Sequence, residues 1–379
     1  MNFSRTLIIK PSSMGDIVQA LPVLTALKEK RPQAKVWWLV GKPFAGLLEG
    51  HPRLEGVIAF DRERFGRIAQ SVSTAILFMR FLKDLRRRRF TAVLDLQGLF
   101  RSGLLALATG APDRVGLRSA RELAALFYTV EVPVPASPGR SPAGPGRSPD
   151  REMHAVDRYM ALAKHVGLDM PKSSDHLPVA AEARARARHA LEAAGLEPGA
   201  PYLVVCAHAR WQTKLWPRDR FVRVIDEVHR RVGARAVIVG DRAAAASAGQ
   251  MVRASSSAPL DLAGRTTLKE LVAVIAEARV MVANDSGPMH VAAAVGTPTV
   301  AIFGPTSPAR TGPYGPGHRV IAGRAVCSPC YRRECPLGGS EAVRCLKNVS
   351  VEEVVELVID RWRAAATRTS AECGMRNAE

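Results

Sequence analysis

The segment from residue 279 to 306 alternates between a short apolar run, a polar turn, a short helix and a second apolar run. Residues 279–283 and 299–303 have the length and composition of buried strands. Between them, Asp285 or Ser286 can cap a helix, and Pro288 suits the first turn of that helix. This order predicts a parallel β-α-β unit that carries small polar groups and a helix N-terminus at the carboxyl edge of its sheet. Such an edge favours phosphate binding, although an ordinary capped β-α-β unit gives the same pattern.

A second strand-loop-helix unit opens the chain. Residues 6–9 form an apolar strand, residues 10–16 read Lys-Pro-Ser-Ser-Met-Gly-Asp, and an amphipathic helix follows over 17–30. Asp16 therefore falls at or next to the start of a helix, where an aspartate commonly caps. The alternative is a carboxylate held at the mouth of a second sheet, facing the first site across a cleft. The two roles are compatible.

Strand-helix alternation continues on both sides of residues 167–200, which contain an Ala/Arg/Glu helix over 180–194. It predicts an α/β protein with two Rossmann-like domains facing across a cleft. We expect a first domain over 1–178, in which the Pro-, Gly-, Ser- and Arg-rich residues 133–150 form a flexible loop, and a second over 179–350. A C-terminal helix over 351–363, which can cross back to the first domain, and a disordered tail complete residues 351–379.

Charge is the unusual feature of the composition. The 379 residues are 47% hydrophobic, which is ordinary for a globular protein, but the formal net charge is +19. Such an excess implies polyanionic partners, and we expect no nucleic acid because zinc-finger, RNA-binding and basic-helix patterns are lacking. Without a long apolar segment or a signal peptide, we expect a cytoplasmic protein that contacts the anionic inner-membrane surface peripherally.

Six segments, taken in order, resemble those of the bacterial heptosyltransferases of glycosyltransferase family 9. They are Ser12-Ser13-Met14-Gly15-Asp16, Asp95-Leu96-Gln97-Gly98-Leu99, residues 119–128, His154-Ala155-Val156-Asp157-Arg158, Lys214-Leu215-Trp216-Pro217 and Asp285-Ser286-Gly287 with His290. The resemblance implies a glycosyltransferase B fold and an inverting transfer of heptose from ADP-heptose to the Kdo-lipid A inner core, with no cofactor and no catalytic metal.

The resemblance also assigns roles to individual residues. Asp16 would deprotonate the acceptor, and Lys214 would contact the donor diphosphate. The further donor-site residues would be Arg210, Asp285, Ser286, Gly287, His290 and Thr306, and the acceptor-site residues would be Ser13, Arg101 and Arg121. The chain departs from the family in the loop before Lys214, which lacks paired hydroxyl residues, and at residues 241–244, where members often carry a glutamate that faces the nucleotide.

Four cysteines form a compact cluster near the C-terminus. Cys327, Cys330, Cys335 and Cys345 are separated by two, four and nine residues. Short thiol spacings of this kind are compatible with a structural zinc site, but we expect a cysteine-containing loop without metal, as some family members have.

Three functions remain open on the sequence alone. The first is transfer of the first heptose, which the residues over 119–128 favour. The second is transfer of the second heptose, or transfer by a related enzyme that uses another nucleotide sugar; the cysteine-rich segment resembles second-heptose enzymes. The third is a non-catalytic nucleotide or nucleic-acid binder, against which the presence of both Asp16 and Lys214 argues.

Overall fold

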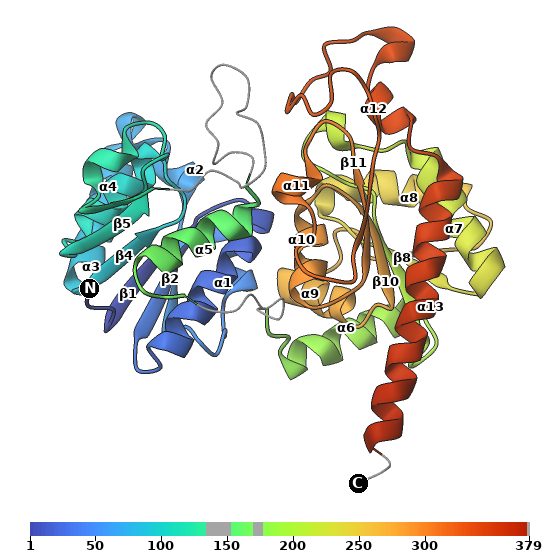
Figure 1. The fold of residues 1–379 in the computed structure, drawn as a ribbon, viewed down its shortest axis with the longest axis horizontal. Helices are drawn as coiled ribbons and strands as arrows, with labels where there is room; N and C mark the ends of the chain where they lie inside the picture. The colour runs from blue at the N-terminus through green and yellow to red at the C-terminus, as the bar shows by residue number, and fades with distance from the viewer. Residues whose placement is uncertain (134–152, 170–176, 377–379) are drawn as a thin grey trace. The chain divides into compact units, whose positions relative to one another are not determined.

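The computed structural model describes residues 1–133, 153–169 and 177–376. The chain divides into two compact units, residues 1–176 and 177–379, and each contains one six-stranded parallel sheet with helices (Figure 1). The predicted α/β class with Rossmann-like sheets is therefore confirmed. The expected flexible loop over 133–150 lies outside the described residues except for Pro133.

The first unit orders its strands β3-β2-β1-β4-β5-β6, and all the neighbouring pairs are parallel. Its strands are β1 (Arg5–Ile9), β2 (Lys35–Gly41), β3 (Gly56–Phe60), β4 (Ala92–Asp95), β5 (Asp113–Leu117) and β6 (Val130–Val132). Its helices are α1 (Met14–Lys30), η1 (Lys42–Leu47), α2 (Arg62–Phe65), η2 (Ile68–Gln70), α3 (Val72–Arg87), α4 (Phe100–Ala108), η3 (Ala124–Phe127) and α5 (Ala155–His165).

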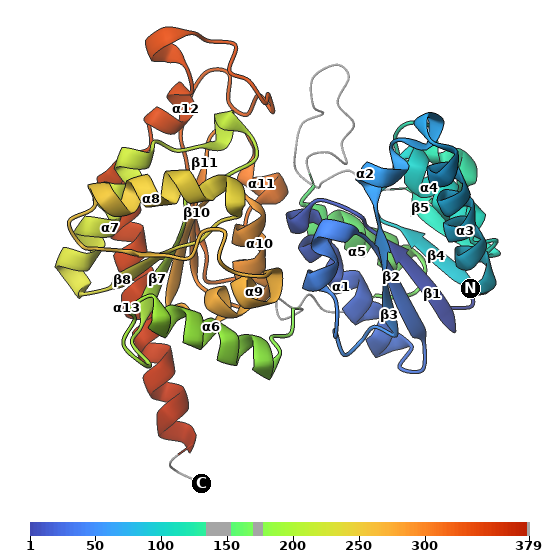
Figure 2. The same ribbon diagram turned by 180° about the vertical axis from the view of Figure 1, so that it is seen from behind.

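Two helical layers cover this sheet. Helices α1 and α5 pack side by side on one face, as Figure 1 shows. On the other face, α3 and α4 are neighbours (Figure 2), and they cover a core that contains Leu7, Trp37, Leu85 and Leu105. The strands β1 and β4 are buried throughout except for Arg5, as expected for a parallel sheet between two layers.

The second unit repeats the architecture with the order β12-β11-β10-β7-β8-β9. Its strands are β7 (Tyr202–Cys206), β8 (Arg235–Ile238), β9 (Leu260–Asp261), β10 (Val280–Asn284), β11 (Thr299–Phe303) and β12 (Arg319–Ala322). Its helices are α6 (Ala181–Ala193), η5 (Gln212–Lys214), α7 (Arg218–Val232), η6 (Arg242–Ala244), α8 (Ala245–Ala254), α9 (Leu268–Ala276), α10 (Gly287–Ala294), α11 (Pro308–Thr311), η7 (Gly339–Glu341), α12 (Arg344–Lys347) and α13 (Val351–Arg376).

The C-terminal helix is longer than predicted. Helix α13 continues to Arg376 instead of ending near residue 363. It packs against α7, β10 and β11 of its own unit, where Val354, Val358 and Trp362 join the core (Figure 1). The expectation that it crosses back to the first domain stays a prediction. No helix in the described ranges combines the length and the hydropathy that a membrane span needs.

Each sheet reverses its direction of winding between two central strands. In the first unit the reversal falls between β1 and β4, and in the second it falls between β7 and β10. Open α/β sheets bind ligands beyond the carboxyl ends of the strands at this point. Asp16 lies in the first turn of α1, the helix that follows β1, and Asp285 directly follows β10, so both predicted sites lie at such a position.

Candidate active site

Asp16 is held by the start of its own helix. Its Oδ2 accepts hydrogen bonds from the Ser13 backbone N–H at 2.9 Å and from the Ser13 hydroxyl at 2.7 Å. Capping therefore fixes the carboxylate, and it leaves the Asp16 side chain 41% exposed. A substrate hydroxyl can reach a carboxylate that is oriented in this way, so capping and proton acceptance are compatible here.

Lys10 is a neighbour of Asp16 to which the sequence analysis gave no role. Its Nζ donates to the Leu96 carbonyl at 3.2 Å and lies 4.0 Å from Asp16 Oδ1, while the residue is only 4% exposed. Burial alone would lower the pKa of Lys10, but Tyr159 and Asp16 outweigh it, and the pKa lies above its ordinary value. A fixed positive charge therefore stands beside the candidate base. A lysine directly after a buried strand was the available signal.

Asp95 organises the neighbouring loop after β4. Its Oδ1 accepts from the backbone N–H groups of Gln97 at 2.9 Å and Gly98 at 3.2 Å, and its Oδ2 accepts from the Tyr128 hydroxyl at 2.7 Å. Burial raises the pKa of Asp95, and these hydrogen bonds oppose that rise. The carboxylate thereby joins the loop after β4 to the segment before β6, a role that the sequence analysis did not assign.

The same loop connects the two predicted acceptor arginines. Gly98 has φ +66°, a left-handed conformation that favours glycine, and its carbonyl accepts from the Arg121 backbone N–H at 2.9 Å. Arg101 follows in the first turn of α4, and both arginines are exposed. The structure thus brings the backbones that carry these side chains together, and Asp95 holds the loop between them.

In the second unit, Lys214, Asp285 and Thr306 form one compact group. Asp285 Oδ2 lies 2.6 Å from Lys214 Nζ and accepts from the Thr306 hydroxyl at 2.6 Å. The Asp285 side chain is 4% exposed and the Lys214 side chain is 17% exposed. The three predicted donor-site residues come from three separate loops, after β7, β10 and β11, and the buried carboxylate orients the lysine for a ligand at that edge.

Helix α10 begins beside this group. Ser286 is its N-cap, Gly287 its first residue, and the Ser286 hydroxyl lies 3.7 Å from the Cys206 thiol. His290 is 7% exposed, so most of its ring is packed within the unit. Asn284, at the end of β10, accepts from the Trp216 backbone N–H at 3.2 Å and donates to the Ala207 carbonyl at 2.9 Å, which ties the Lys214 loop to the strand ends.

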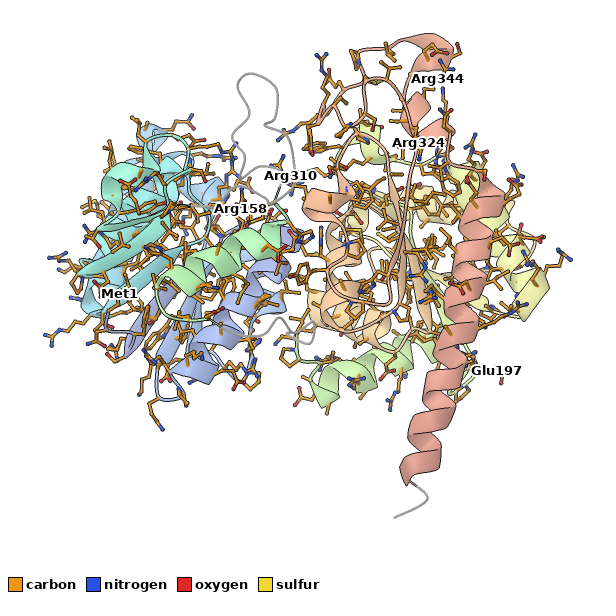
Figure 3. All side chains as sticks on the ribbon, viewed as in Figure 1. Met1, Arg158, Glu197, Arg310, Arg324 and Arg344 are labelled. Atoms are coloured by element: carbon orange, nitrogen blue, oxygen red, sulfur yellow. The ribbon has the colours of Figure 1, made fainter. Side chains whose placement is uncertain are left out.

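The loop before Lys214 contacts the cysteine-rich segment, which the sequence analysis did not anticipate. Thr213 donates to the Arg332 carbonyl at 2.7 Å. The centroid of the Trp211 ring is 4.7 Å from Lys214 Nζ and 5.5 Å from the Arg333 guanidinium carbon. Arg310 on α11, labelled in Figure 3, lies 5.1 Å from the Tyr331 ring. Arg210 is exposed and makes no hydrogen bond or ion pair with another described side chain.

The four clustered cysteines carry free thiols. Cys345 is buried, and burial together with the nearby Cys327, Cys330 and Cys335 raises the pKa of its thiol. Within residues 1–133, 153–169 and 177–376, no group of three or more His, Cys, Asp or Glu side chains is arranged to hold a metal ion. The zinc hypothesis therefore stays a prediction that the described geometry does not support.

Known proteins resemble this chain over most of its length. The model for glycosyltransferase family 9 (heptosyltransferase) matches residues 78–141 and 145–340. The lipopolysaccharide heptosyltransferase 1 of Pseudomonas aeruginosa is 30% identical over 353 residues, which cover 92% of each chain. The chain belongs to glycosyltransferase family 9. It is therefore a glycosyltransferase.

Solved structures of the family share both units. The family 9 glycosyltransferase of Veillonella parvula aligns over 96% of this chain and 98% of its own, with a TM-score of 0.77 at 20% identity, which concerns the fold alone. The E. coli heptosyltransferase WaaC with ADP aligns over 94% of this chain and 99% of its own, with a TM-score of 0.71 at 25% identity. The family 9 fold thus accounts for the two sheets and their order along the chain.

Proposed function

We propose that this family 9 enzyme transfers the first heptose from ADP-heptose to the Kdo-lipid A inner core of lipopolysaccharide. The observation that carries the proposal is the buried group of Lys214, Asp285 and Thr306 beside the start of α10. A lysine next to a helix N-terminus suits a diphosphate. The relative named heptosyltransferase 1, which aligns over 92% of this chain, supports the choice of sugar and of acceptor.

The reaction is a single displacement. The acceptor hydroxyl oxygen attacks the anomeric carbon of the heptose, and the bond from that carbon to the β-phosphate oxygen of ADP breaks with inversion. The acceptor proton passes to Asp16 as the new bond forms, and ADP departs with the bonding electrons. Asp16 is placed for this because Ser13 holds one of its oxygens while the side chain stays 41% exposed.

The donor binds the second unit without a catalytic metal in this proposal. Lys214, the exposed Arg210 and the N-terminal amides of α10 supply positive charge for the leaving diphosphate. Asp285 keeps Lys214 in place, and Thr306 fixes the same Asp285 oxygen. Because residues 241–244 differ from the family pattern, adenosine recognition rests on other contacts than a glutamate at that position.

The acceptor binds the first unit. Ser13 lies beside Asp16, and Arg101 and Arg121 provide exposed guanidinium groups for the phosphates or Kdo carboxylates of the acceptor. Because this acceptor is a lipid, we also propose that the enzyme acts at the cytoplasmic face of the inner membrane. The +19 charge favours an anionic surface of that kind.

A donor and acceptor panel tests the proposal. The protein is incubated with ADP-heptose and with other nucleotide sugars, each together with Kdo-lipid A or with the heptosylated acceptor, and the released nucleotide is measured. We expect ADP release only with ADP-heptose and the heptose-free acceptor, and we expect it to persist in EDTA. Preference for the heptosylated acceptor would instead assign the second transfer, and Mg²⁺-dependent recovery after EDTA would contradict the metal-free mechanism.

A further inference from the structure

The outer surface of the first unit exposes an unusual number of large apolar side chains. Among the described residues, eleven large hydrophobic side chains are exposed, and seven of them come from α3, α4, the turn η3 and the residue that precedes η3. We call these seven the α3–α4 face. They are Val72, Ile76, Met79, Phe100, Leu107, Leu123 and Leu126.

Helix α3 presents a continuous apolar stripe to solvent. Val72, Ile76 and Met79 are 79%, 49% and 63% exposed, and their spacing of four and three residues places them on one side of the helix. The opposite side already packs on the core, where Leu85 is buried and Phe78 and Phe81 contact Phe65. The exposed stripe therefore takes no part in the core of this unit.

The rest of the face lies on the neighbouring elements. Phe100 and Leu107 are seven residues apart on α4 and are 46% and 43% exposed. The turn η3 packs on α4 through a Phe100–Phe127 ring contact at 5.2 Å, and it carries Leu126. Helix α3 adjoins α4 in the same layer (Figure 2), so the seven side chains lie on neighbouring elements of the first unit.

Cations surround these apolar side chains. Residues 62–89 contain nine Lys or Arg and two Asp or Glu, a net charge of +7. On α3, Lys83 follows Met79 by four residues and so lies on the same side of the helix as the stripe. Arg80 directly follows Met79 in the sequence. Arg101 follows Phe100, and Arg121 precedes Leu123 by two residues. The face thus combines exposed hydrocarbon with exposed positive charge.

We propose that the α3–α4 face is the surface by which this enzyme binds an anionic lipid bilayer. Apolar side chains that enter the region between headgroups and acyl chains, with cations beside them at anionic headgroups, give a peripheral protein its two sources of membrane affinity. A second copy of the chain fits poorly, because a two-fold contact would bring the same +7 segments together. Nucleic acid would pair with the cations, but it would leave the apolar side chains of the stripe exposed to water.

This inference rests on the proposed function, and it specifies how the enzyme meets a lipid acceptor. Arg101 and Arg121, the proposed acceptor ligands, border the same face. A bilayer bound there presents its headgroups to these guanidinium groups, so that an acceptor anchored in the bilayer reaches the first unit without leaving the membrane.

Vesicle flotation without any substrate tests the proposal. The full chain is mixed with vesicles of phosphatidylcholine alone or with about one third phosphatidylglycerol, a typical anionic mixture. The apolar variant is Ile76→Ser with Met79→Ser, and the charge variant is Arg80→Glu with Lys83→Glu. Matched controls in the second unit are Val326→Ser with Leu337→Ser, whose side chains are also exposed, and Arg253→Glu with Arg363→Glu.

We expect the parent protein to bind the anionic vesicles, and the affinity to fall at least about tenfold in each test variant and less than about twofold in each control. Transfer to a deacylated, water-soluble acceptor should stay normal in the test variants, since they leave Asp16 and Lys214 untouched. The proposal is overturned if the parent ignores anionic vesicles, if the test variants bind like the controls, or if Ile76→Ser with Met79→Ser changes only self-association. If the parent protein binds the vesicles as expected but does not transfer heptose, the proposed function is wrong and the membrane surface is not.

Discussion

Both candidate sites lie at the point where their sheet reverses its winding, Asp16 after β1 and Asp285 after β10, but their carboxylates differ in exposure and in partners. Asp16 is 41% exposed and is oriented by neutral Ser13 donors, with Lys10 4.0 Å away. Asp285 is 4% exposed and lies 2.6 Å from Lys214. One architecture therefore supplies an accessible carboxylate in one unit and a charge-compensated, buried pair in the other.

This difference predicts which variants change mainly the reaction rate and which also change stability. Removing the charge of an exposed carboxylate costs little folding energy, so its loss should appear in the reaction rate. Removing one partner of a buried ion pair leaves the other charge without compensation, so its loss should appear in stability as well as in ligand binding. The contrast predicts distinct phenotypes for variants of the two sites.

The largest effect should come from Asp16→Asn. The amide keeps the shape of the side chain but cannot accept the acceptor proton, and general bases contribute roughly 10²–10⁴ to the rate. We expect the transfer rate to fall at least about 100-fold, while the free energy of unfolding falls less than in Lys214→Ala, because the buried Lys10 keeps its hydrogen bond to the Leu96 carbonyl. Rapid-quench measurement of product formation gives the rate, and near-normal turnover would remove Asp16 from the mechanism.

Lys214→Ala should impair transfer and stability together. The variant removes a cation from the diphosphate site. The buried Asp285 carboxylate then keeps the hydrogen bond from the Thr306 hydroxyl but loses its cation. We expect kcat/KM for the donor to fall about 10- to 100-fold and the free energy of unfolding to fall on the order of 2 kcal/mol. Urea denaturation measures the second quantity.

A matched substitution sharpens this prediction. The double variant Lys214→Ala with Asp285→Asn removes both charges of the pair and should recover part of the lost stability without recovering the donor kcat/KM. If the double variant were no more stable than Lys214→Ala, the ion pair would not be the source of the destabilisation.

Much of the fold could be predicted because the central strands are apolar on both faces. The apolar runs over 6–9, 279–283 and 299–303 correspond to β1, β10 and β11, since buried parallel strands need no alternation. The strands β5 and β12 were missed because Asp113, Arg114 and Arg319 interrupt their apolar character. Such strands are defined by the neighbours they pair with, which the sequence does not display.

The part of the site that could be predicted is the part with a local signal in the sequence. Asp16 and Asp285 stand directly at helix starts after buried strands, and that local signal located them. Lys10 and Asp95 are also at strand ends, but their roles depend on partners at a distance in the chain, such as Tyr159 and Tyr128. The contact of the Lys214 loop with the cysteine-rich segment is likewise a tertiary property.

Tyr128→Phe should give a moderate, pH-dependent loss of stability. Burial holds the pKa of Asp95 above its ordinary value, and the hydrogen bond from the Tyr128 hydroxyl opposes that rise. Between the unfolded and the folded pKa, the folded state holds more protons, so stability falls as pH rises. The variant raises the folded pKa further and extends this window upward.

We expect Tyr128→Phe to lose about 1–2 kcal/mol at pH 7 and less below about pH 3, where the carboxyl group is protonated in both states. Urea titrations across this range measure the difference from the parent. Tyr202→Phe is the control, because the Tyr202 hydroxyl donates to the neutral Val274 carbonyl at 2.7 Å. Equal pH dependence in both variants would contradict the account of Asp95.

The smallest effects should come from the exposed acceptor arginines. Arg101→Ala and Arg121→Ala should each raise the acceptor KM about three- to tenfold with little change in donor KM, because a single exposed charge is partly screened. The acceptor KM of the parent should rise with salt more steeply than the donor KM. A flat salt dependence, or an effect confined to the donor KM, would move the acceptor away from these residues.

The assignment of donor binding to the second unit and of proton acceptance to the first is tested most directly by calorimetric titration of ADP into Asp16→Asn and Lys214→Ala. We predict that Asp16→Asn binds ADP within about twofold of the parent and that Lys214→Ala binds it at least about tenfold more weakly. Weaker binding by Asp16→Asn together with normal binding by Lys214→Ala would contradict the division of labour between the two units.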